Sequence, residues 1–498
     1  MARRSTFVGL DVGTTGVKAI AVSPNGEVVA RAEREYPLAT PAPGWAEQDP
    51  EDWWRASEAA LAAVGAEHAA GIGLSGQMHG LVALDETDRV IRPAILWNDQ
   101  RTSAECEEIE RRIGVERLIR LTGNRALTEL VGAERLIELT LNPALPGFSL
   151  PKLLWVRENE PELWARVRSI LLPKDYVRFC LTGERATDVA DASGTLLFDV
   201  AERRWSGEVL EALELPPEWL PAALESPELS GRTANGTPVA AGAGDQAAGA
   251  LGVGVAGPRP LSVVLGTSGV VFAALPAYAP EPEARLHVFC HAVPGTWHAM
   301  GVMLSAAGSL RWFRDAFAPG VAYDELLAGA DDVEPGADGV LFLPYLSGER
   351  TPHADPHARA AFTGLGLAHG RPALTRAVLE GVAYGLRDSL ELLRQLGVRA
   401  ESGRVSGGGA RSRLWLQIVA STLGIPLELT AAEEGAAFGA ALLGAVATGA
   451  FSDVHEAVEE CVRPRERFEP DAGWMRTYEA GYPRYRALYP SLEHLEER

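Results

Sequence analysis

The chain has 498 residues, a formal net charge of −21 and an apolar content of 47%, which are typical of a soluble globular protein. A single hydrophobic core stops growing at roughly 250–300 residues, so the length predicts two domains. The acidic balance argues against nucleic-acid and membrane partners, and four separated cysteines argue against a disulfide framework or a zinc site. The start of the chain has no signal-peptide pattern, which favours a cytoplasmic location.

The first half alternates between strand and helix patterns. Apolar runs at 7–10 and 17–22 flank a turn, and an alternating strand follows over 27–34. A helix is predicted from Pro50 to about His68, with acidic residues in its first turn, and a short strand follows at 72–74. This alternation predicts the α/β class.

The second half begins as the first does. Gly13-Thr14-Thr15-Gly16 recurs as Gly266-Thr267-Ser268-Gly269, 253 residues later, with apolar runs on both sides of each copy. A strand–turn–strand unit at the head of each half predicts two related domains that face each other. The Gly- and Pro-rich stretch at 253–260 is the expected junction, which gives domains 1–254 and 255–498.

Two further segments have distinctive sequences. Residues 436–451 form an uncharged run that is too short to span a membrane and predicts a tightly packed buried helix. Residues 114–127 and 132–145 match at ten of fourteen positions. This match indicates a local tandem duplication at the surface of the first domain, with chance similarity of two helices as the alternative.

The turn at Gly13, Thr14 and Thr15 could bind phosphate. Glycines let backbone amides approach a phosphate group, and threonine hydroxyls add donors. Asp11 could hold Mg²⁺ through water, and Lys18 could neutralise phosphate charge. An ordinary hairpin turn is the alternative, and the second copy at Gly266, Thr267 and Ser268 makes it less favoured.

Asp245 lies among small residues in the segment 242–250, where substrate and cofactor could approach it. A single carboxylate can accept the proton of an attacking hydroxyl during phosphoryl transfer. An N-cap aspartate before an Ala-rich helix is an equally good interpretation of the pattern.

Polar loops supply the other candidates. The Gly-rich turn at 406–412 follows a strand and precedes a helix, so its backbone could pack against a nucleotide; a tight connecting turn is the alternative. Gln77, Met78 and His79 could contact sugar hydroxyls, although a loop histidine with satisfied hydrogen bonds is the better interpretation from chemistry alone. Trp97 could stack on a sugar, but a core tryptophan fits equally well.

Taken together, these motifs resemble the FGGY family of carbohydrate kinases over nearly the whole chain. The matching segments are DVGTTGVK at 11–18, LGTSG at 265–269, GGGARS at 407–412, EEGAAFGAALLGA at 433–445 and GFSLPKLLWVREN at 147–159. Within the family, SGQMHG at 75–80 resembles the members that act on D-xylulose.

The resemblance implies two actin-like domains, as in the sugar kinase, chaperone and actin ATPases, with the active site in the cleft between them. It implies ATP-dependent phosphorylation of D-xylulose to D-xylulose 5-phosphate, with Mg²⁺ and a possible homodimer. A kinase of glycerol, ribulose or another ketose or polyol, or a non-kinase actin-like ATPase, is the alternative.

The resemblance also implies roles for individual residues. Asp245 is the implied catalytic base and, with Asp11, a metal ligand; it also belongs to the substrate site. Gln246 departs from the asparagine that is usual after the base, so its sugar contact is less secure. The remaining implied substrate contacts are Gln77, Met78, His79 and Trp97, and the implied ATP and phosphate contacts are Gly13, Thr14, Thr15, Lys18, Gly266, Thr267, Ser268, Gly408, Gly409, Ala410 and Ser412.

Overall fold

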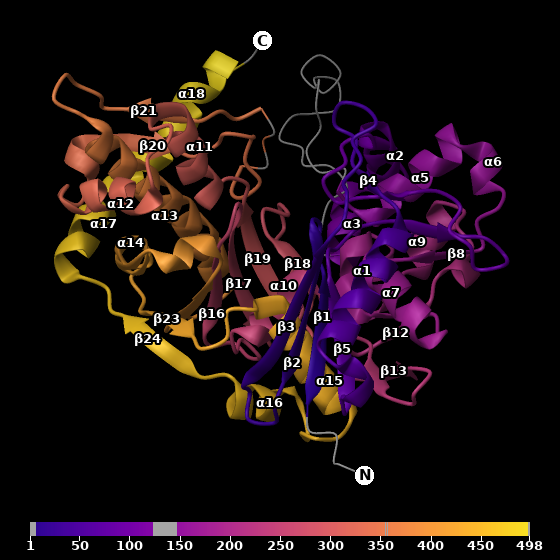
Figure 1. The fold of residues 1–498 in the computed structure, drawn as a ribbon. Coiled ribbons are helices and arrows are strands. Elements are labelled where there is room, and N and C mark those ends of the chain that lie inside the picture. The colour runs from indigo at the N-terminus through magenta and orange to yellow at the C-terminus, as the bar shows by residue number, and fades with distance from the viewer. Residues whose placement is uncertain (1–5, 123–146, 354, 356, 497–498) are drawn as a thin grey trace.

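A computed structural model describes residues 6–122, 147–353, 355 and 357–496. The duplication predicted at 114–127 and 132–145 falls largely outside these residues and stays a prediction. The chain forms two large lobes, each built on a seven-stranded sheet (Figure 1).

The first sheet begins with the predicted meander. Strands β1 (Phe7–Val12), β2 (Gly16–Val22) and β3 (Val28–Glu35) pair in antiparallel order. On the other side of β1, strand β5 (Gly71–Gly76) runs parallel, followed by β14 (Pro238–Ala240), also parallel. Strand β13 (Leu229–Arg232) closes that edge.

The second sheet repeats this plan. Strands β16 (Leu261–Leu265), β17 (Gly269–Leu275) and β19 (Trp297–Met303) pair in antiparallel order. Strands β22 (Gly403–Ser406) and β23 (Leu427–Thr430) continue parallel to β16. The prediction of two related halves is therefore confirmed, while the boundary at 254/255 stays a prediction. Strands β18 (His287–Cys290) and β24 (Pro464–Phe468) form the two edges.

The predicted first helix is shorter than expected. Helix α1 (Pro50–Ala63) begins with a hydrogen bond from Glu51 N–H to the Asp49 side chain. It ends before Gly65, which has a left-handed φ of 71° and separates it from a short 3-10 turn at Ala66–His68. The sequence prediction of one helix up to His68 is wrong here, because the left-handed backbone at Gly65 breaks the α-helical path.

The remaining helices fall into two sets. The first half contains α2 (Ser103–Ile113), α3 (Val115–Thr122), α5 (Ser149–Asn159), α6 (Pro161–Trp164), α7 (Pro173–Thr182), α8 (Val189–Ala192), α9 (Gly207–Ala212) and α10 (Asp245–Gly252). The second half contains α11 (Ala307–Phe317), α12 (Tyr323–Asp331), α13 (Arg371–Gln395), α14 (Arg413–Leu423), α15 (Gly435–Ala447), α16 (Val454–Cys461), α17 (Ala472–Arg486) and α18 (Leu488–Glu496). None of the helices in these described ranges is long and apolar enough to cross a membrane.

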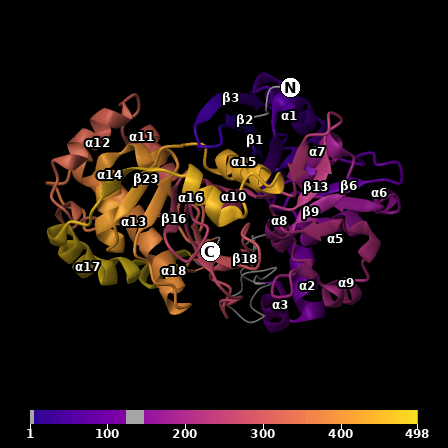
Figure 2. The same ribbon diagram turned by 90° about the horizontal axis from the view of Figure 1, so that it is seen from below.

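Helix α15 belongs to the second half of the chain but lies against the first sheet (Figure 2). It approaches β1 and β5 so closely that a side chain on Gly9 would lie 1.8 Å from the Ala437 carbonyl oxygen, and one on Gly73 would lie 1.9 Å from that of Ala440. The same helix meets α10, where a side chain on Gly439 would lie 1.9 Å from the Ala248 carbonyl oxygen. The predicted buried helix is confirmed, and the glycines are required because backbone meets backbone.

Candidate active site

The parallel strands of the first sheet bring two acids together. In the register of β1 and β5, Asp11 lies opposite Ser75. Strand β15 (Ala243–Gly244) pairs with the end of β5, and α10 begins directly after it at Asp245. Because the carboxyl ends of parallel strands meet at one edge, Asp11 and Asp245 share that edge, which is the usual place for ligands in α/β sheets.

The two carboxyl groups differ in their electrostatic setting. The Ser75 hydroxyl donates to Asp11 Oδ1 at 2.9 Å, yet burial keeps the pKa of Asp11 above its ordinary value. Burial, and after it the negative charge of Asp11, raises the pKa of Asp245 to about 7. A carboxyl group with such a pKa can accept a proton near neutral pH.

The structure resolves one open alternative for Asp245. Gly244 occupies the N-cap position of α10, and Asp245 is the first residue of the helix. The N-cap interpretation is therefore wrong. The Asp245 carboxylate instead accepts a hydrogen bond from the Gln246 side-chain amide at 3.3 Å.

The first Gly-Thr loop is held by neighbouring side chains. The Tyr36 hydroxyl donates to the Gly13 carbonyl, and the Gln48 amide donates to the Thr14 carbonyl at 2.7 Å. Thr15 accepts from the Tyr36 backbone amide through its own carbonyl. Lys18 lies opposite Asp11 in the β1–β2 register, where its charge lowers the pKa of Asp11, and it also pairs with Glu33 at 2.9 Å.

Trp97 and Gln77 differ in their exposure to solvent. Trp97 is 44% exposed, and its indole N–H donates to Thr14 Oγ1 at 2.9 Å, so the core interpretation is wrong. Gln77 is buried, and its amide donates to Gln48 Oε1 at 3.2 Å, behind the first loop. Gln77 thus braces the loop, and a direct sugar contact for it stays a prediction.

His79 has an unusual backbone and a defined ring. Its φ is 69°, in the left-handed region, and its Nδ1 lies 2.6 Å from the Gly194 carbonyl oxygen. A carbonyl can only accept, so Nδ1 carries the proton and Nε2 is an acceptor. Burial lowers the pKa of His79 to about 3, and the charges of Lys152 and Arg350 add to this, so the ring is neutral at physiological pH.

Glycines surround His79 and Met78 closely. A side chain on Gly194 would lie 2.7 Å from the His79 ring and 2.9 Å from Met78 Cε. A side chain on Gly244 would lie 2.8 Å from Met78 Cγ. Both predicted substrate residues therefore have little freedom to move toward Gly194 or Gly244.

Aromatic rings from both halves of the chain lie around His79. Phe289 of β18, in the second half, lies 6.3 Å from the His79 ring, and Phe148, in the first half, lies 4.8 Å from it in an edge-on arrangement. Arg350 donates to His287 Nε2 at 2.9 Å, and the His287 ring lies 5.9 Å from Phe148. The two halves thus meet around His79.

The second Gly-Thr loop is held by a helix. Backbone amides of Ala306 and Ala307, at the start of α11, donate to the Thr267 and Gly266 carbonyls at 2.8 Å each. Arg311 donates to Thr267 Oγ1 at 2.9 Å. Thr267 and Ser268 are exposed.

The Gly-rich turn lies beside that loop. Gly407 has a φ of 89°, and a side chain there would lie 2.8 Å from the Gly266 backbone nitrogen. Gly408 is exposed, with open space where a side chain would be, and Gly409 is buried against Leu265. Ala410 N–H donates to the Gly407 carbonyl at 3.1 Å, and the Ser412 hydroxyl caps α14 by accepting from Trp415 N–H at 3.2 Å.

Several residues of the site were not among the predicted ones. Ser75, Gly194 and Arg311 hold Asp11, His79 and Thr267 in place. Ser75 directly follows the strand predicted at 72–74, but its position opposite Asp11 depends on the parallel pairing of β1 and β5, which was not predicted. Gly194 is far from His79 in sequence, and no local pattern indicates their contact.

Comparisons with known proteins agree with this geometry. Residues 6–252 match the FGGY family of carbohydrate kinases, N-terminal domain, and residues 261–448 match its C-terminal domain. The chain is 41% identical to the xylulose kinase of Escherichia coli over 98% of this chain and 99% of that protein. It is 37% identical to the xylulose kinase of Bacillus subtilis, with 98% and 97% covered.

Solved structures also match. A xyloylose kinase from Brucella ovis has a TM-score of 0.89 and 42% identity, with 98% of this chain and all of that chain covered. The xylulose kinase from Rhodospirillum rubrum has a TM-score of 0.88 and 31% identity, with 99% and 100% covered. With two sheets of one plan, an acid pair at the edge of the first sheet and both family domains matched along its length, this chain belongs to the FGGY family of carbohydrate kinases.

Proposed function

We propose that this enzyme transfers the γ-phosphoryl group of ATP to the terminal hydroxyl of D-xylulose and forms D-xylulose 5-phosphate. The observation that carries the proposal is the position of Asp245, whose pKa of about 7 suits a general base and whose strand edge also holds Asp11 and the first Gly-Thr loop. The names of the relatives at 37–41% identity support the same substrate.

Asp245 acts on the sugar. Its deprotonated carboxylate accepts the proton of the terminal hydroxyl as that oxygen attacks the γ-phosphorus. The Gln246 amide, 3.3 Å away, restrains the carboxylate oxygen that faces it. Positioning matters most here, since phosphoryl transfer needs little covalent chemistry from the protein.

The acid pair also fits a magnesium ion. Hard oxygen donors are the ligands that Mg²⁺ prefers, and Asp11 and Asp245 supply carboxylates on one strand edge. The pKa of Asp245 is raised partly by the charge of Asp11, so a cation between these residues would relieve that repulsion. When bound, Mg²⁺ would neutralise phosphate charge. Among the described residues, no group of three or more acids, histidines or cysteines forms a site for a resident metal, which fits an ion that arrives with the nucleotide.

His79 and Met78 supply the sugar selectivity. The His79 Nε2 is an acceptor and can accept a hydrogen bond from one sugar hydroxyl, while Met78 offers only an apolar surface. A site built to hydrogen-bond a group rejects analogues without it, because its own polar atoms are left unpaired. A ketopentose has four hydroxyls and a carbonyl, whereas glycerol has three hydroxyls, so glycerol lacks one hydroxyl and the carbonyl.

A substrate panel tests the proposal. D-xylulose, D-ribulose, L-ribulose and glycerol are compared in a coupled assay of sugar-dependent ADP release. D-xylulose should give the highest kcat/KM, with glycerol poorer by about tenfold or more. A higher kcat/KM for any of the other three would overturn the substrate assignment and leave the kinase family unchanged.

A further inference from the structure

The three lysines of this arginine-rich chain occupy selected places. Of the 46 basic side chains, the only lysines are Lys18, Lys152 and Lys174. Lys18 lies opposite Asp11, whereas Lys152 and Lys174 are fully buried. Lys152 contacts the backbone of His79 directly, and Lys174 contacts the segment whose Gly194 carbonyl binds the His79 ring.

Lys152 holds the backbone of His79. Its ammonium group donates to the His79 carbonyl at 2.7 Å and to the Gly147 carbonyl at 2.6 Å. The Ser149 hydroxyl donates to the same His79 carbonyl at 3.2 Å. A left-handed residue other than glycine is costly and persists only where its surroundings fix it, so these bonds explain how His79 keeps its φ of 69°.

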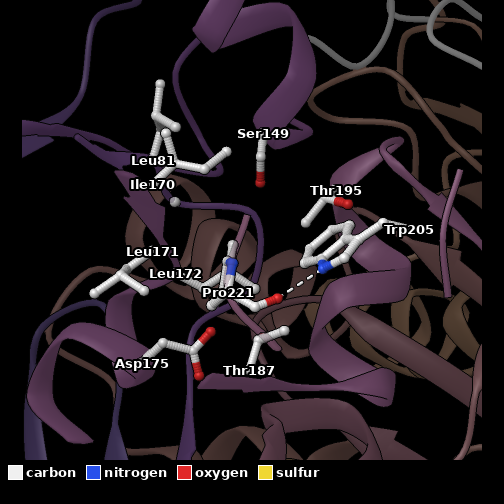
Figure 3. A pocket seen from close by; sticks show the side chains of 11 residues that line it. Leu81, Ser149, Ile170, Leu171, Leu172, Asp175, Thr187, Thr195, Trp205 and Pro221 are labelled. Atoms are coloured by element: carbon white, nitrogen blue, oxygen red, sulfur yellow. Dashed lines mark hydrogen bonds between the residues drawn. The ribbon is translucent and has the colours of Figure 1, made fainter. Parts of the chain in front are cut away.

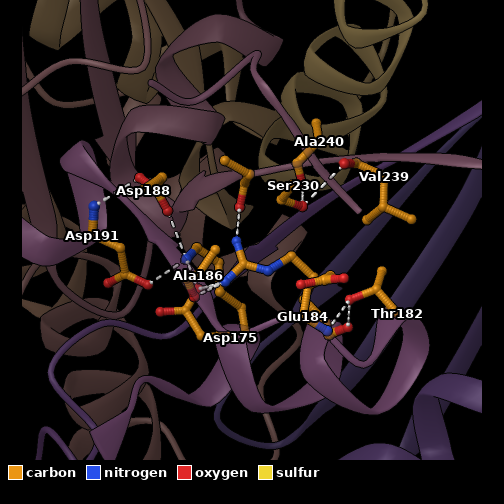
Figure 4. A network of polar contacts seen from close by, with 12 residues as sticks. Asp175, Thr182, Glu184, Ala186, Asp188, Asp191, Ser230, Val239 and Ala240 are labelled. Carbon is orange, nitrogen blue, oxygen red and sulfur yellow. Dashed lines mark hydrogen bonds and ion pairs between the residues drawn. The ribbon is translucent and has the colours of Figure 1, made fainter. Parts of the chain in front are cut away.

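Lys174 holds the partner of the His79 ring. Its ammonium group lies 2.6 Å from Asp175, 2.6 Å from Asp188 and 3.1 Å from Asp191, and the three carboxylates converge as Figure 4 shows. Asp188 and Asp191 belong to the start and body of α8, which runs directly into the turn of Ser193–Thr195. That turn carries the Gly194 carbonyl, so Lys174 fixes the acceptor for His79 Nδ1.

A pocket lies next to Gly80, between the start of α5 and the strand that precedes α8 (Figure 3). Its lining includes Ser149, Asp175, Thr187 and Thr195. Two of these lining residues belong to the contacts described above, because Ser149 donates to the His79 carbonyl and Asp175 pairs with Lys174.

We propose that Lys152 and Lys174 are positioning residues for His79, and that through His79 they set the affinity and selectivity of the enzyme for its sugar. This inference rests on the proposed function for one point, which is that the sugar bound beside His79 is D-xylulose. Neither lysine touches the reacting atoms, so both act on sugar binding and leave the ATP site and the chemical step nearly unchanged.

The kinetic test uses Lys152→Met and Lys174→Met, with Arg157→Met as the matched control. Arg157 is also a cation on α5 that donates to a carbonyl, but its partner is Leu213, at 2.9 Å. Each lysine variant should raise the KM for D-xylulose about tenfold and narrow the preference over glycerol, with kcat and the KM for ATP within about twofold of wild type. The Arg157 variant should keep the wild-type KM.

A double-mutant cycle separates positioning from general damage. In the His79→Ala background, Lys152→Met should change the KM for sugar less than about twofold, because the group that it positions is gone. Equal losses in both backgrounds would overturn the proposal. If Lys174→Met does not fold, Asp191→Asn keeps the volume and removes one carboxylate from Lys174; if Lys152→Met does not fold, Ser149→Ala removes the other donor to the His79 carbonyl.

A spectroscopic measurement is independent of the substrate. Histidines labelled with ¹⁵N report their tautomers, and His79→Ala identifies the His79 signals. Wild type and Arg157→Met should show His79 protonated at Nδ1, and the lysine variants should show a mixture of tautomers. An unchanged Nδ1 tautomer in both lysine variants would overturn the proposal. If D-xylulose itself proves not to be a substrate, the proposed function fails, while this measurement and a cycle with the best sugar of the panel still decide the role of the lysines.

Discussion

The two Gly-Thr loops have the same place in their sheets but are held in opposite ways. Side chains hold the first loop, with Tyr36 and Gln48 donating to carbonyls of Gly13 and Thr14. The start of a helix holds the second, through amides of Ala306 and Ala307 that donate to Thr267 and Gly266. The same strand–turn–strand unit is therefore held by side chains in the first half and by backbone amides of a helix in the second half.

The difference extends to charge. Beside the first loop lie the carboxylates of Asp11 and Asp245, and beside the second lie the guanidinium of Arg311 and the N-terminus of α11. Carboxylates suit a metal ion and a proton, whereas a guanidinium suits phosphate oxygens. The two loops thus differ in charge, because carboxylates lie beside the first and a guanidinium lies beside the second.

Removing the proposed base, Asp245, should have the largest effect on kcat. Asp245→Asn should lower kcat by about 10²–10⁴, with little change in the KM for sugar, because Asn keeps the size but cannot accept the proton. Steady-state kinetics of the purified variant measure this. Near wild-type kcat would remove Asp245 from the mechanism.

Stability provides the control for that variant. Asp245 holds its proton up to about pH 7 in the folded chain, while the unfolded chain releases it near 3.8. Its ionisation therefore opposes folding progressively between these values and fully above them. Thermal unfolding at pH 8 should show Asp245→Asn to be at least as stable as wild type, so a lower Tm would point to damage other than loss of the base.

The pH profile should reveal the coupling between the two acids. In wild type, kcat/KM should fall about tenfold per pH unit below about pH 7, where Asp245 becomes protonated. Asp11→Asn removes a negative charge that raises the pKa of Asp245, so the acid limb of the residual activity should move by about one unit to lower pH. A limb at an unchanged pH would show that the two carboxyl groups do not interact.

A change beside the second Gly-Thr loop should affect the KM for ATP and not the KM for sugar. Arg311→Gln removes a guanidinium from Thr267 and should raise the KM for ATP by about tenfold, with the KM for sugar unchanged. Kinetics with each substrate varied in turn separate the two constants. An equal rise in the KM for ATP and the KM for sugar would contradict separate roles for the two loops.

The smallest effect is expected at the exposed brace of the first loop. Trp97→Phe removes the indole N–H that donates to Thr14 Oγ1 at 2.9 Å, and Trp97 is 44% exposed. A hydrogen bond so open to solvent is worth little, so kcat/KM should fall only about twofold to threefold. A loss comparable to that of Asp245→Asn would instead give Trp97 a direct part in catalysis.

The sequence allowed the first strands and the Gly-Thr turn of each half to be predicted, because apolar runs and turn residues are local patterns. Asp245 was a candidate because of its small neighbours, but the N-cap interpretation fitted equally well, and its pairing with Asp11 was implied only by the family resemblance. The Gly65 break in the first helix was missed, because glycine within a helical pattern is often tolerated.

The supports of His79 could not be predicted. The Gly194 carbonyl and the Lys152 ammonium reach His79 from residues far along the chain. Their contacts depend on how α5 and α8 pack together, which no short pattern encodes. The same holds for Arg350, which meets His287 from another loop.

The close approach of α15 to β1 and β5 has a consequence for the order in which the protein is made. A ribosome completes β1 and β5 early, but the helix that covers them is among the last parts of the chain to emerge. The nascent first half therefore exposes the backbone of Gly9 and Gly73 through most of synthesis, and its final folding must wait until α15 has been made. A fragment that ends at the junction between the halves would keep that uncovered surface permanently and should require the second fragment, supplied in trans, to become soluble and native.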